Sequence, residues 1–131
     1  MRIRMKLTTS NEEYLHAIYI LTRSGESARI TDIASFLGVQ KPSAHTAINT
    51  LKEEGMIFYE KYKEITLTDK GEACAEYIHR RHELFKKFLT KILEVDAALA
   101  ESEADSLSHC VSCHTTAKLE NFIGELLKKQ E

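Results

Sequence analysis

Hydrophobic residues near the start of the chain recur every three or four positions, which is the spacing of one face of a helix. Leu15 and Ile18 follow this spacing, and the run ends before Gly25. Ser10 and Glu13 have the spacing of a capping box, in which each side chain accepts from a free backbone amide at the start of a helix. We therefore predict a first helix that begins at Ser10.

Two shorter helical patterns follow. The first begins at Thr31 and ends at Gly38, a residue type that readily adopts the conformation at which helices end. The second has Pro42 in its first turn, where the missing amide hydrogen of proline does no harm, and it ends at Gly55. Two short helices joined by a tight turn indicate a helix-turn-helix.

The next residues predict a small β-hairpin. Met56–Tyr59 has the composition of a strand, residues 60–64 form a polar turn, and Ile65–Leu67 is the returning strand. A hairpin directly after the second helix of a helix-turn-helix is the wing of a winged helix. Thr68 then caps a long helix, and two further helices are expected at about 96–110 and 113–129, the last with Ser112 as its cap.

Composition narrows the class of protein. The chain has 131 residues, of which 43% are hydrophobic and 29% charged, with five Gly and one Pro, as in a helix-rich globular protein. No run approaches the roughly 20 apolar residues of a membrane span, and the basic segment Met1–Lys6 lacks the apolar region of a signal peptide. Three cysteines are typical of a reducing compartment, so we expect a cytoplasmic protein with no membrane partner.

The helix-turn-helix carries polar groups where DNA contacts are expected. The formal charge of −2 does not exclude DNA, since only a local basic patch is needed. The first residues of a recognition helix contact base edges, and a wing reaches phosphates. The other interpretations are a solvated helix face or a protein-interaction module. The candidate DNA-binding residues are Gln40, Lys41, Pro42, Ser43, His45 and Thr46 on the helix, Lys61 and Lys63 on the wing, and Arg29.

Histidines and carboxylates share helix faces in three places. Imidazole and carboxylate groups together suit a divalent transition metal, provided that the three helices converge. Taken singly, each residue also has a simpler interpretation, as a cap, a hydrogen-bonded core histidine, a solvated helix face or a small buried cysteine. The candidates are Glu13 and His16 on the first helix, His82 on the long helix, Glu101, Asp105 and His109 on the next helix, and Cys110 beside them.

Several ordered segments resemble the diphtheria toxin repressor family, and within it the two-domain manganese transport regulators. The similarity runs from about Thr8 to Leu127. It is carried by Thr8-Thr-Ser-Asn-Glu-Glu-Tyr-Leu-His-Ala-Ile-Tyr19, Ile33-Ala-Ser-Phe-Leu-Gly-Val39, Lys41-Pro-Ser43, Leu67-Thr-Asp-Lys-Gly71, Arg81-His-Glu-Leu84 and His109-Cys-Val-Ser112.

The resemblance implies a homodimeric repressor that binds operator DNA and has a divalent metal as corepressor in transition-metal homeostasis. The fold is then mainly α, with an N-terminal winged helix-turn-helix (1–71) and a C-terminal helical metal-binding and dimerisation domain (72–131). The SH3-like third domain of larger members is expected to be absent. The family's ligand positions fall on Glu13, His16, His82, Asp105, Ser108 and His109, and Glu101 matches an ancillary metal position of iron-sensing relatives.

The chain departs from the manganese regulators at four of these positions. Glu13 stands where they have Asp, His16 where they have Glu, and Asp105 replaces Glu or Cys. Ser108 replaces a ligating Glu, and a neutral hydroxyl is a weak ligand. Fewer hard oxygen donors favour Fe²⁺, Co²⁺ or Zn²⁺ over Mn²⁺, and a thiolate from Cys110 would strengthen that preference.

Other functions stay open at this stage. Loss of the carboxylate at Ser108 would fit a metal-independent winged-helix regulator with a degenerate site, and the Cys110-x-x-Cys113 pair would fit a thiol sensor. A metalloenzyme is disfavoured because the sequence contains no HExxH, glycine-rich phosphate loop or nucleophile elbow. A winged helix that binds only proteins is the remaining alternative.

Overall fold

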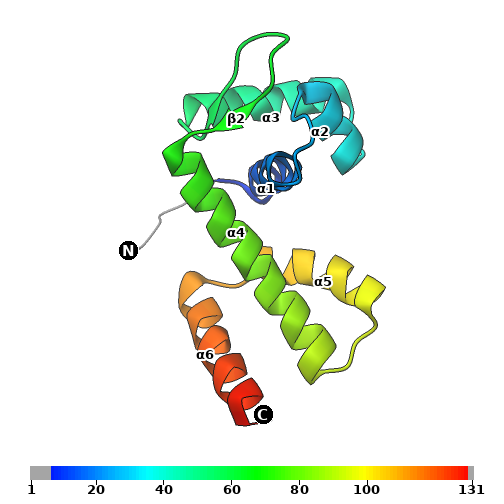
Figure 1. Ribbon diagram of the computed structural model, residues 1–131, viewed down its shortest axis with the longest axis vertical. Coiled ribbons are helices and arrows are strands. Elements are labelled where there is room, and N and C mark those ends of the chain that lie inside the picture. The colour runs from blue at the N-terminus through cyan, green and yellow to red at the C-terminus, as the bar shows by residue number, and fades with distance from the viewer. Residues whose placement is uncertain (1–6, 130–131) are drawn as a thin grey trace. The chain divides into compact units, whose positions relative to one another are not determined.

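A computed structural model describes residues 7–129, so the predicted absence of a signal peptide concerns a segment, Met1–Lys6, outside the described residues. The chain forms two compact units, Met1–Ile78 and His79–Glu131, which divide within one continuous helix. The elements are α1 (Thr9–Arg23), α2 (Ile30–Leu37), α3 (Lys41–Glu53), β1 (Ile57–Phe58), β2 (Thr66–Leu67), α4 (Asp69–Lys87), the π-helical segment η1 (Phe88–Ile92), α5 (Ala97–Cys110) and α6 (Cys113–Lys129) (Figure 1).

This architecture confirms the predicted fold class. The described residues are mostly helical, and a two-stranded antiparallel hairpin follows the helix-turn-helix. Within residues 7–129, no helix has the length and apolar character needed to cross a membrane.

The start of α1 differs from the prediction. Thr8 is the N-cap, and its Oγ1 accepts a hydrogen bond of 3.1 Å from the backbone amide of Asn11. Ser10 is already inside the helix, so the capping box between Ser10 and Glu13 is wrong. Thr8 offers the same hydroxyl chemistry two residues earlier and takes the capping position.

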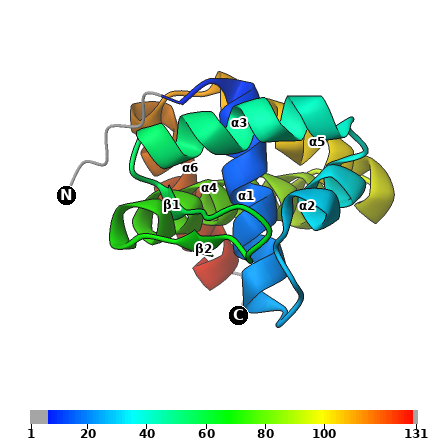
Figure 2. The ribbon, with the colours of Figure 1, turned by 90° about the horizontal axis from the view of Figure 1, so that it is seen from above.

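The helix-turn-helix forms as the sequence indicates. Gly38 ends α2 with φ at 67°, in the left-handed region that glycine adopts without strain. The amide of Val39 bonds the carbonyl of Ala34 at 3.0 Å and closes the turn. Pro42 lies in the first turn of α3. Viewed from above, α2 and α3 both pack against α1 (Figure 2).

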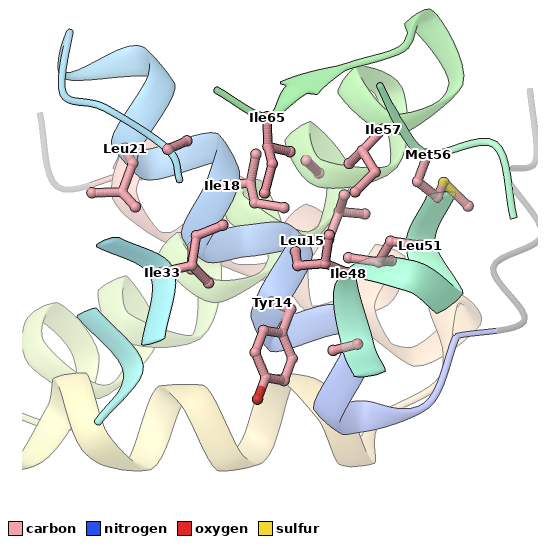
Figure 3. Packing of buried hydrophobic residues seen from close by; sticks show 14 of the residues in the cluster. Tyr14, Leu15, Ile18, Leu21, Ile33, Ile48, Leu51, Met56, Ile57 and Ile65 are labelled. Carbon is pink, nitrogen blue, oxygen red and sulfur yellow. The ribbon is translucent and has the colours of Figure 1, made fainter. Parts of the chain in front are cut away.

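The first unit has one continuous apolar core. Side chains from all three helices and from the hairpin converge on it (Figure 3). This burial fixes how α3 is presented, because α3 cannot move without opening the core. The core includes Leu15, Ile18 and Leu21 of α1, Ile33 of α2, Ile48 and Leu51 of α3, and Met56, Ile57 and Ile65 of the hairpin region.

The start of α4 is held against the hairpin by close backbone contact. Thr68 caps the helix as predicted, since its Oγ1 accepts from the amide of Gly71 at 3.0 Å. Its own amide donates to the carbonyl of Met56 at 3.1 Å. A Cβ atom on Gly71 would lie 1.8 Å from that Met56 oxygen, so only glycine fits there.

The second unit packs α5 and α6 against the C-terminal half of α4. Its apolar cluster is small, with Phe85 and Leu89 against Ala100 and Ala104. The segment η1 was not predicted; the amide of Leu93 bonds the carbonyl five residues earlier at 3.1 Å, as in a π-helix. As predicted, Ser112 caps α6, its Oγ accepting from the amide of Thr115 at 3.2 Å.

Candidate metal centre and nucleic-acid interface

The His82 side chain on α4 lies between two carboxylates of α5. Its Nε2 atom is 3.0 Å from Oε1 of Glu101, and its Nδ1 atom is 3.8 Å from Oδ1 of Asp105. Glu101 and Asp105 are four residues apart and therefore lie one above the other on the same face of the helix. The His82 side chain is only 7% exposed, as the apolar residues around it in the sequence predicted.

His109 adds a second imidazole to the Asp105 side of this arrangement. It lies one turn after Asp105 on α5, and its Nε2 atom is 3.7 Å from the same Oδ1 atom. One carboxylate oxygen thus lies near ring nitrogens from two helices. Two imidazoles and a carboxylate form a donor set that suits a divalent transition metal, so the residues present fit such an ion.

Lys86 contacts the outer carboxylate, and the sequence analysis did not identify it. Its Nζ atom is 2.8 Å from Oε2 of Glu101. This hydrogen bond lowers the pKa of the Glu101 carboxyl against the opposing effect of burial, and the hydrogen bond to His82 lowers it further. The same contact raises the pKa of Lys86. Lys86 follows His82 by four residues, which was the available signal that both lie on one face of α4.

Arg81 is a second residue that the sequence analysis missed. It is buried, and its Nη2 atom is 3.3 Å from Nδ1 of His109. A guanidinium group can only donate, so Nδ1 of His109 is the acceptor in this contact. Its position beside His82 in the Arg81-His-Glu-Leu84 segment was the only sequence signal.

The remaining candidates of α5 and α6 are placed differently. Ser108 is 1% exposed, and its hydroxyl donates to the backbone carbonyl of Asp105 at 3.0 Å. Cys110 and Cys113 are exposed free thiols at the junction of the two helices. Among residues 7–129, neither cysteine belongs to a group of three or more His, Cys, Asp or Glu side chains with ligand atoms within 4.8 Å of one another.

Glu13 and His16 lie on α1 of the first unit. They are three residues apart and half-buried, so they share one face of the helix as predicted. With Thr8 as the cap, Glu13 is not needed to complete a capping box.

The start of α3 presents an exposed polar surface. Its side chains point away from the core that holds Ala44, Ala47 and Ile48. Thr46 also bonds back to the carbonyl of Pro42 at 3.1 Å. The exposed predicted DNA-binding residues here are Gln40, Lys41, Pro42, Ser43, His45 and Thr46.

The basic residues near the wing have distinct intramolecular contacts. Arg29 donates from Nη1 to the carbonyl of Tyr62 at 3.3 Å and so ties the wing tip to the start of α2. Lys63 pairs with Glu60 at 2.8 Å. The Lys61 ammonium lies 5.0 Å from the centre of the Tyr62 ring. Tyr62, 80% exposed, was missed by the sequence analysis although it is an aromatic residue in a polar turn.

A winged helix-turn-helix joined to a helical unit with two imidazoles and a carboxylate defines a class, the DNA-binding regulators that respond to a metal ion. Family models agree with both halves. Residues 6–65 match the N-terminal DNA binding domain of the iron dependent repressors. Residues 68–130 match the metal binding and dimerisation domain of the same family.

Related proteins and solved structures are also metal-dependent or HTH-type transcriptional regulators. The HTH-type transcriptional regulator MntR of Lysinibacillus sphaericus is 31% identical over 116 residues, which covers 88% of this chain and 83% of the relative. The manganese regulator SloR is 30% identical with a TM-score of 0.78, over 90% of this chain and 55% of that one. A manganese-dependent transcriptional repressor in complex with manganese is 29% identical with a TM-score of 0.80, over 87% and 52%.

The chain belongs to the iron-dependent repressor family of metal-dependent transcriptional repressors, as the resemblance predicted. It spans about half the length of the two solved structures.

Proposed function

We propose that this chain represses transcription by binding operator DNA as a homodimer when a divalent transition metal is held by His82, Asp105 and His109 with Glu13 and His16. The observation that carries the proposal is the Asp105 oxygen lying near imidazole nitrogens of α4 and α5. The protein would act in the cytoplasm and by binding rather than by catalysis.

The donor set favours Fe²⁺, Co²⁺ or Zn²⁺ over Mn²⁺. Two imidazoles are already present in the second unit, and His16 would add a third. The buried Ser108 uses its hydroxyl proton on its own helix and offers no carboxylate. Nitrogen-rich sites suit these ions, whereas manganese, which is bound in the manganese-dependent repressor complex named above, prefers oxygen donors. A thiolate from the exposed Cys110 would add to the same preference, and equal metal content in a Cys110→Ala variant would remove it from the set.

The mechanism is a linkage between the two units. When bound, the metal supplies a positive charge that attracts all of its ligands to one point. Glu13 and His16 belong to the DNA-binding unit, so holding them with His82, Asp105 and His109 restricts how each α3 is presented. Two α3 helices in a dimer would then match half-sites about 34 Å apart, one turn of DNA. Couplings of this kind are typically about 1–3 kcal/mol, or roughly 5–150-fold in affinity.

Arg81 has to change its contact in this mechanism. If Nε2 of His109 is the ligand atom, the ring proton must sit on Nδ1, which then cannot accept from Arg81. We therefore expect the contact between Arg81 and His109 to be lost in the metal-bound form. The contact with Arg81 and the bond to the metal therefore need different tautomers of His109, so only one of the two can form at a time.

Fluorescence anisotropy tests the proposal. Labelled DNA from upstream of the protein's own coding sequence is titrated at fixed salt, because phosphate contacts make affinity salt-dependent. Chelator, Mn²⁺, anaerobic Fe²⁺, Co²⁺ and Zn²⁺ are compared. We expect specific binding to be roughly 5–150-fold tighter with the preferred ion. His109→Gln should lose this dependence, whereas His114→Gln, an exposed histidine of α6, should keep it.

Two results would contradict the proposal. Equally tight specific binding in chelator would favour a metal-independent or thiol-gated regulator, and a change on oxidation that needs both Cys110 and Cys113 would then identify the thiol sensor. Unchanged metal dependence in His109→Gln would show that the ion binds elsewhere.

A further inference from the structure

The two carboxylates beside His82 have different neighbours. Both oxygens of Glu101 are engaged, Oε1 with Nε2 of His82 at 3.0 Å and Oε2 with the Lys86 ammonium at 2.8 Å. On the other side of the ring, Asp105 faces Nδ1 of His82 at 3.8 Å and Nε2 of His109 at 3.7 Å. One carboxylate therefore already has a cation from the protein, and the other lies between two imidazole nitrogens.

We propose that Glu101 is a positioning residue rather than a metal ligand, that it fixes the ring proton of His82 on Nε2, and that the Lys86 ammonium takes the place of a second cation. The chain then holds one metal ion per protomer. This inference rests on the proposed function for the identity of the metal centre, and it changes the role predicted for Glu101.

The hydrogen-bond geometry determines the tautomer. A neutral imidazole carries one proton, and a carboxylate oxygen at 3.0 Å can only accept it. In the neutral ring the proton thus belongs on Nε2, which leaves Nδ1 as the nitrogen that a metal ion would use. Metal-ligating histidines commonly donate their other ring N–H to a carboxylate in this way, which sets the orientation of the ring and makes it a better ligand.

Lys86 makes a second ion on Glu101 unfavourable. A divalent cation bound to that carboxylate would lie next to the ammonium group, and like charges at such short range repel each other. Lys86 also offsets the charge of Glu101, so two carboxylates can stand one turn apart on α5. A single ion would then bind on the other side of the His82 ring, near Asp105 and His109.

Nitrogen-15 NMR of the imidazole rings tests the tautomer in the metal-free protein. In the neutral ring of His82 we expect the proton on Nε2 rather than on Nδ1. Glu101→Ala should shift His82 toward a mixture of both tautomers, while Glu103→Ala, an exposed carboxylate of the same helix, should leave it unchanged. A neutral His82 ring with its proton on Nδ1 in the wild type would overturn the inference.

Metal counting tests the role of Lys86. Isothermal titration with Co²⁺, together with elemental analysis, should give one ion per chain in the wild type and in Lys86→Arg. Lys86→Glu should take up a second ion, and Lys87→Glu, the same change at the adjacent exposed lysine, should not. Glu101→Ala should keep one ion but bind it roughly 10–100-fold more weakly, the usual effect of losing an outer-shell partner.

The outcomes separate this inference from the proposed function. Two ions in the wild type, or unchanged affinity in Glu101→Ala, would overturn the inference and leave a metal-dependent repressor intact. No bound ion at all would contradict the proposed function, while the NMR result would still decide where His82 carries its proton.

Discussion

The two units of the molecule use their buried positions differently. In the DNA-binding unit, apolar side chains of α1, α2, α3 and the hairpin fill one continuous core. In the second unit, the apolar cluster comprises Phe85, Leu89, Ala100 and Ala104 among the described residues, and Arg81, His82 and Ser108 are buried near it. The first unit is thus stabilised by hydrophobic burial, and the second gives interior positions to groups that hydrogen-bond or bind.

This difference separates the reading of DNA from the sensing of metal. A unit with a full apolar core keeps its shape whatever the metal concentration, so α3 is always formed. A unit with a small apolar cluster has less stability of its own, so a ligand that binds the folded form contributes a larger share of it. The stability of the second unit should therefore depend on the metal more strongly than that of the first.

The largest expected effect comes from the apolar core. Leu15→Ala removes a fully buried side chain and should lower the free energy of unfolding by about 2–5 kcal/mol, measured by urea denaturation. Leu89→Ala in the smaller cluster should fall at the lower end of about 2–5 kcal/mol, because a sparse cluster can relax around the gap. The exposed Leu93→Ala should change stability by less than about 0.5 kcal/mol. Equal losses at Leu15 and Leu89 would contradict the contrast between the units.

Metal binding should have the next largest effect. At a free ion concentration 100 times the Kd, stability should rise by about 2.7 kcal/mol, and His109→Gln should abolish the gain. Hydrogen exchange should show added protection in α5 and in the His82 turn of α4. If Glu13 and His16 also bind the ion, α1 should gain protection as well, and protection confined to α4 and α5 would remove them from the ligand set.

A pair of glycine substitutions tests the junction between the hairpin and α4. Gly71→Ala places a methyl group against the Met56 carbonyl and should cost about 1–3 kcal/mol. Gly124→Ala, in the middle of α6 with no atom within 4 Å, should instead stabilise the protein by about 0.5–1 kcal/mol. Thermal unfolding measures the stability of both variants. A loss of stability in both would show that helix propensity does not determine the effect of Gly124→Ala.

The smallest effect is expected at the wing. Lys61→Ala should reduce the slope of log affinity against log salt by about 0.9, the value for one phosphate contact. Lys63→Ala should change it less, since that ammonium is already paired with Glu60. Salt titrations of operator binding measure both, and a larger change at Lys63 would mean that DNA breaks its ion pair.

Local signals in the sequence were enough for most of the fold. Gly38, Pro42 and Ser112 each act through their own backbone or side-chain chemistry, so their positions at helix ends could be predicted. The N-cap of α1 was predicted wrongly because Thr8 and Ser10 offer the same hydroxyl group two residues apart, and the structure uses Thr8. The π-helical η1 could not be predicted, since five-residue hydrogen bonding leaves no distinct apolar period.

The contacts of the candidate site could be predicted less well than the residue types that form it. His82, Asp105 and His109 were singled out by residue type and helix spacing. Which carboxylate meets which ring nitrogen depends on how α4 and α5 align, and no spacing within one helix gives that. The pairing of Lys86 with Glu101, and of Arg29 with the Tyr62 carbonyl, follows from the same long-range packing.

The burial of Ser108 limits which side chains position 108 of this chain can hold. A glutamate there would put a longer, negatively charged side chain where the serine is 1% exposed, with its hydroxyl bonded to the helix backbone. A buried carboxylate without a cation is strongly unfavourable, so a Ser108→Glu variant would need metal to fold before it could use metal to sense.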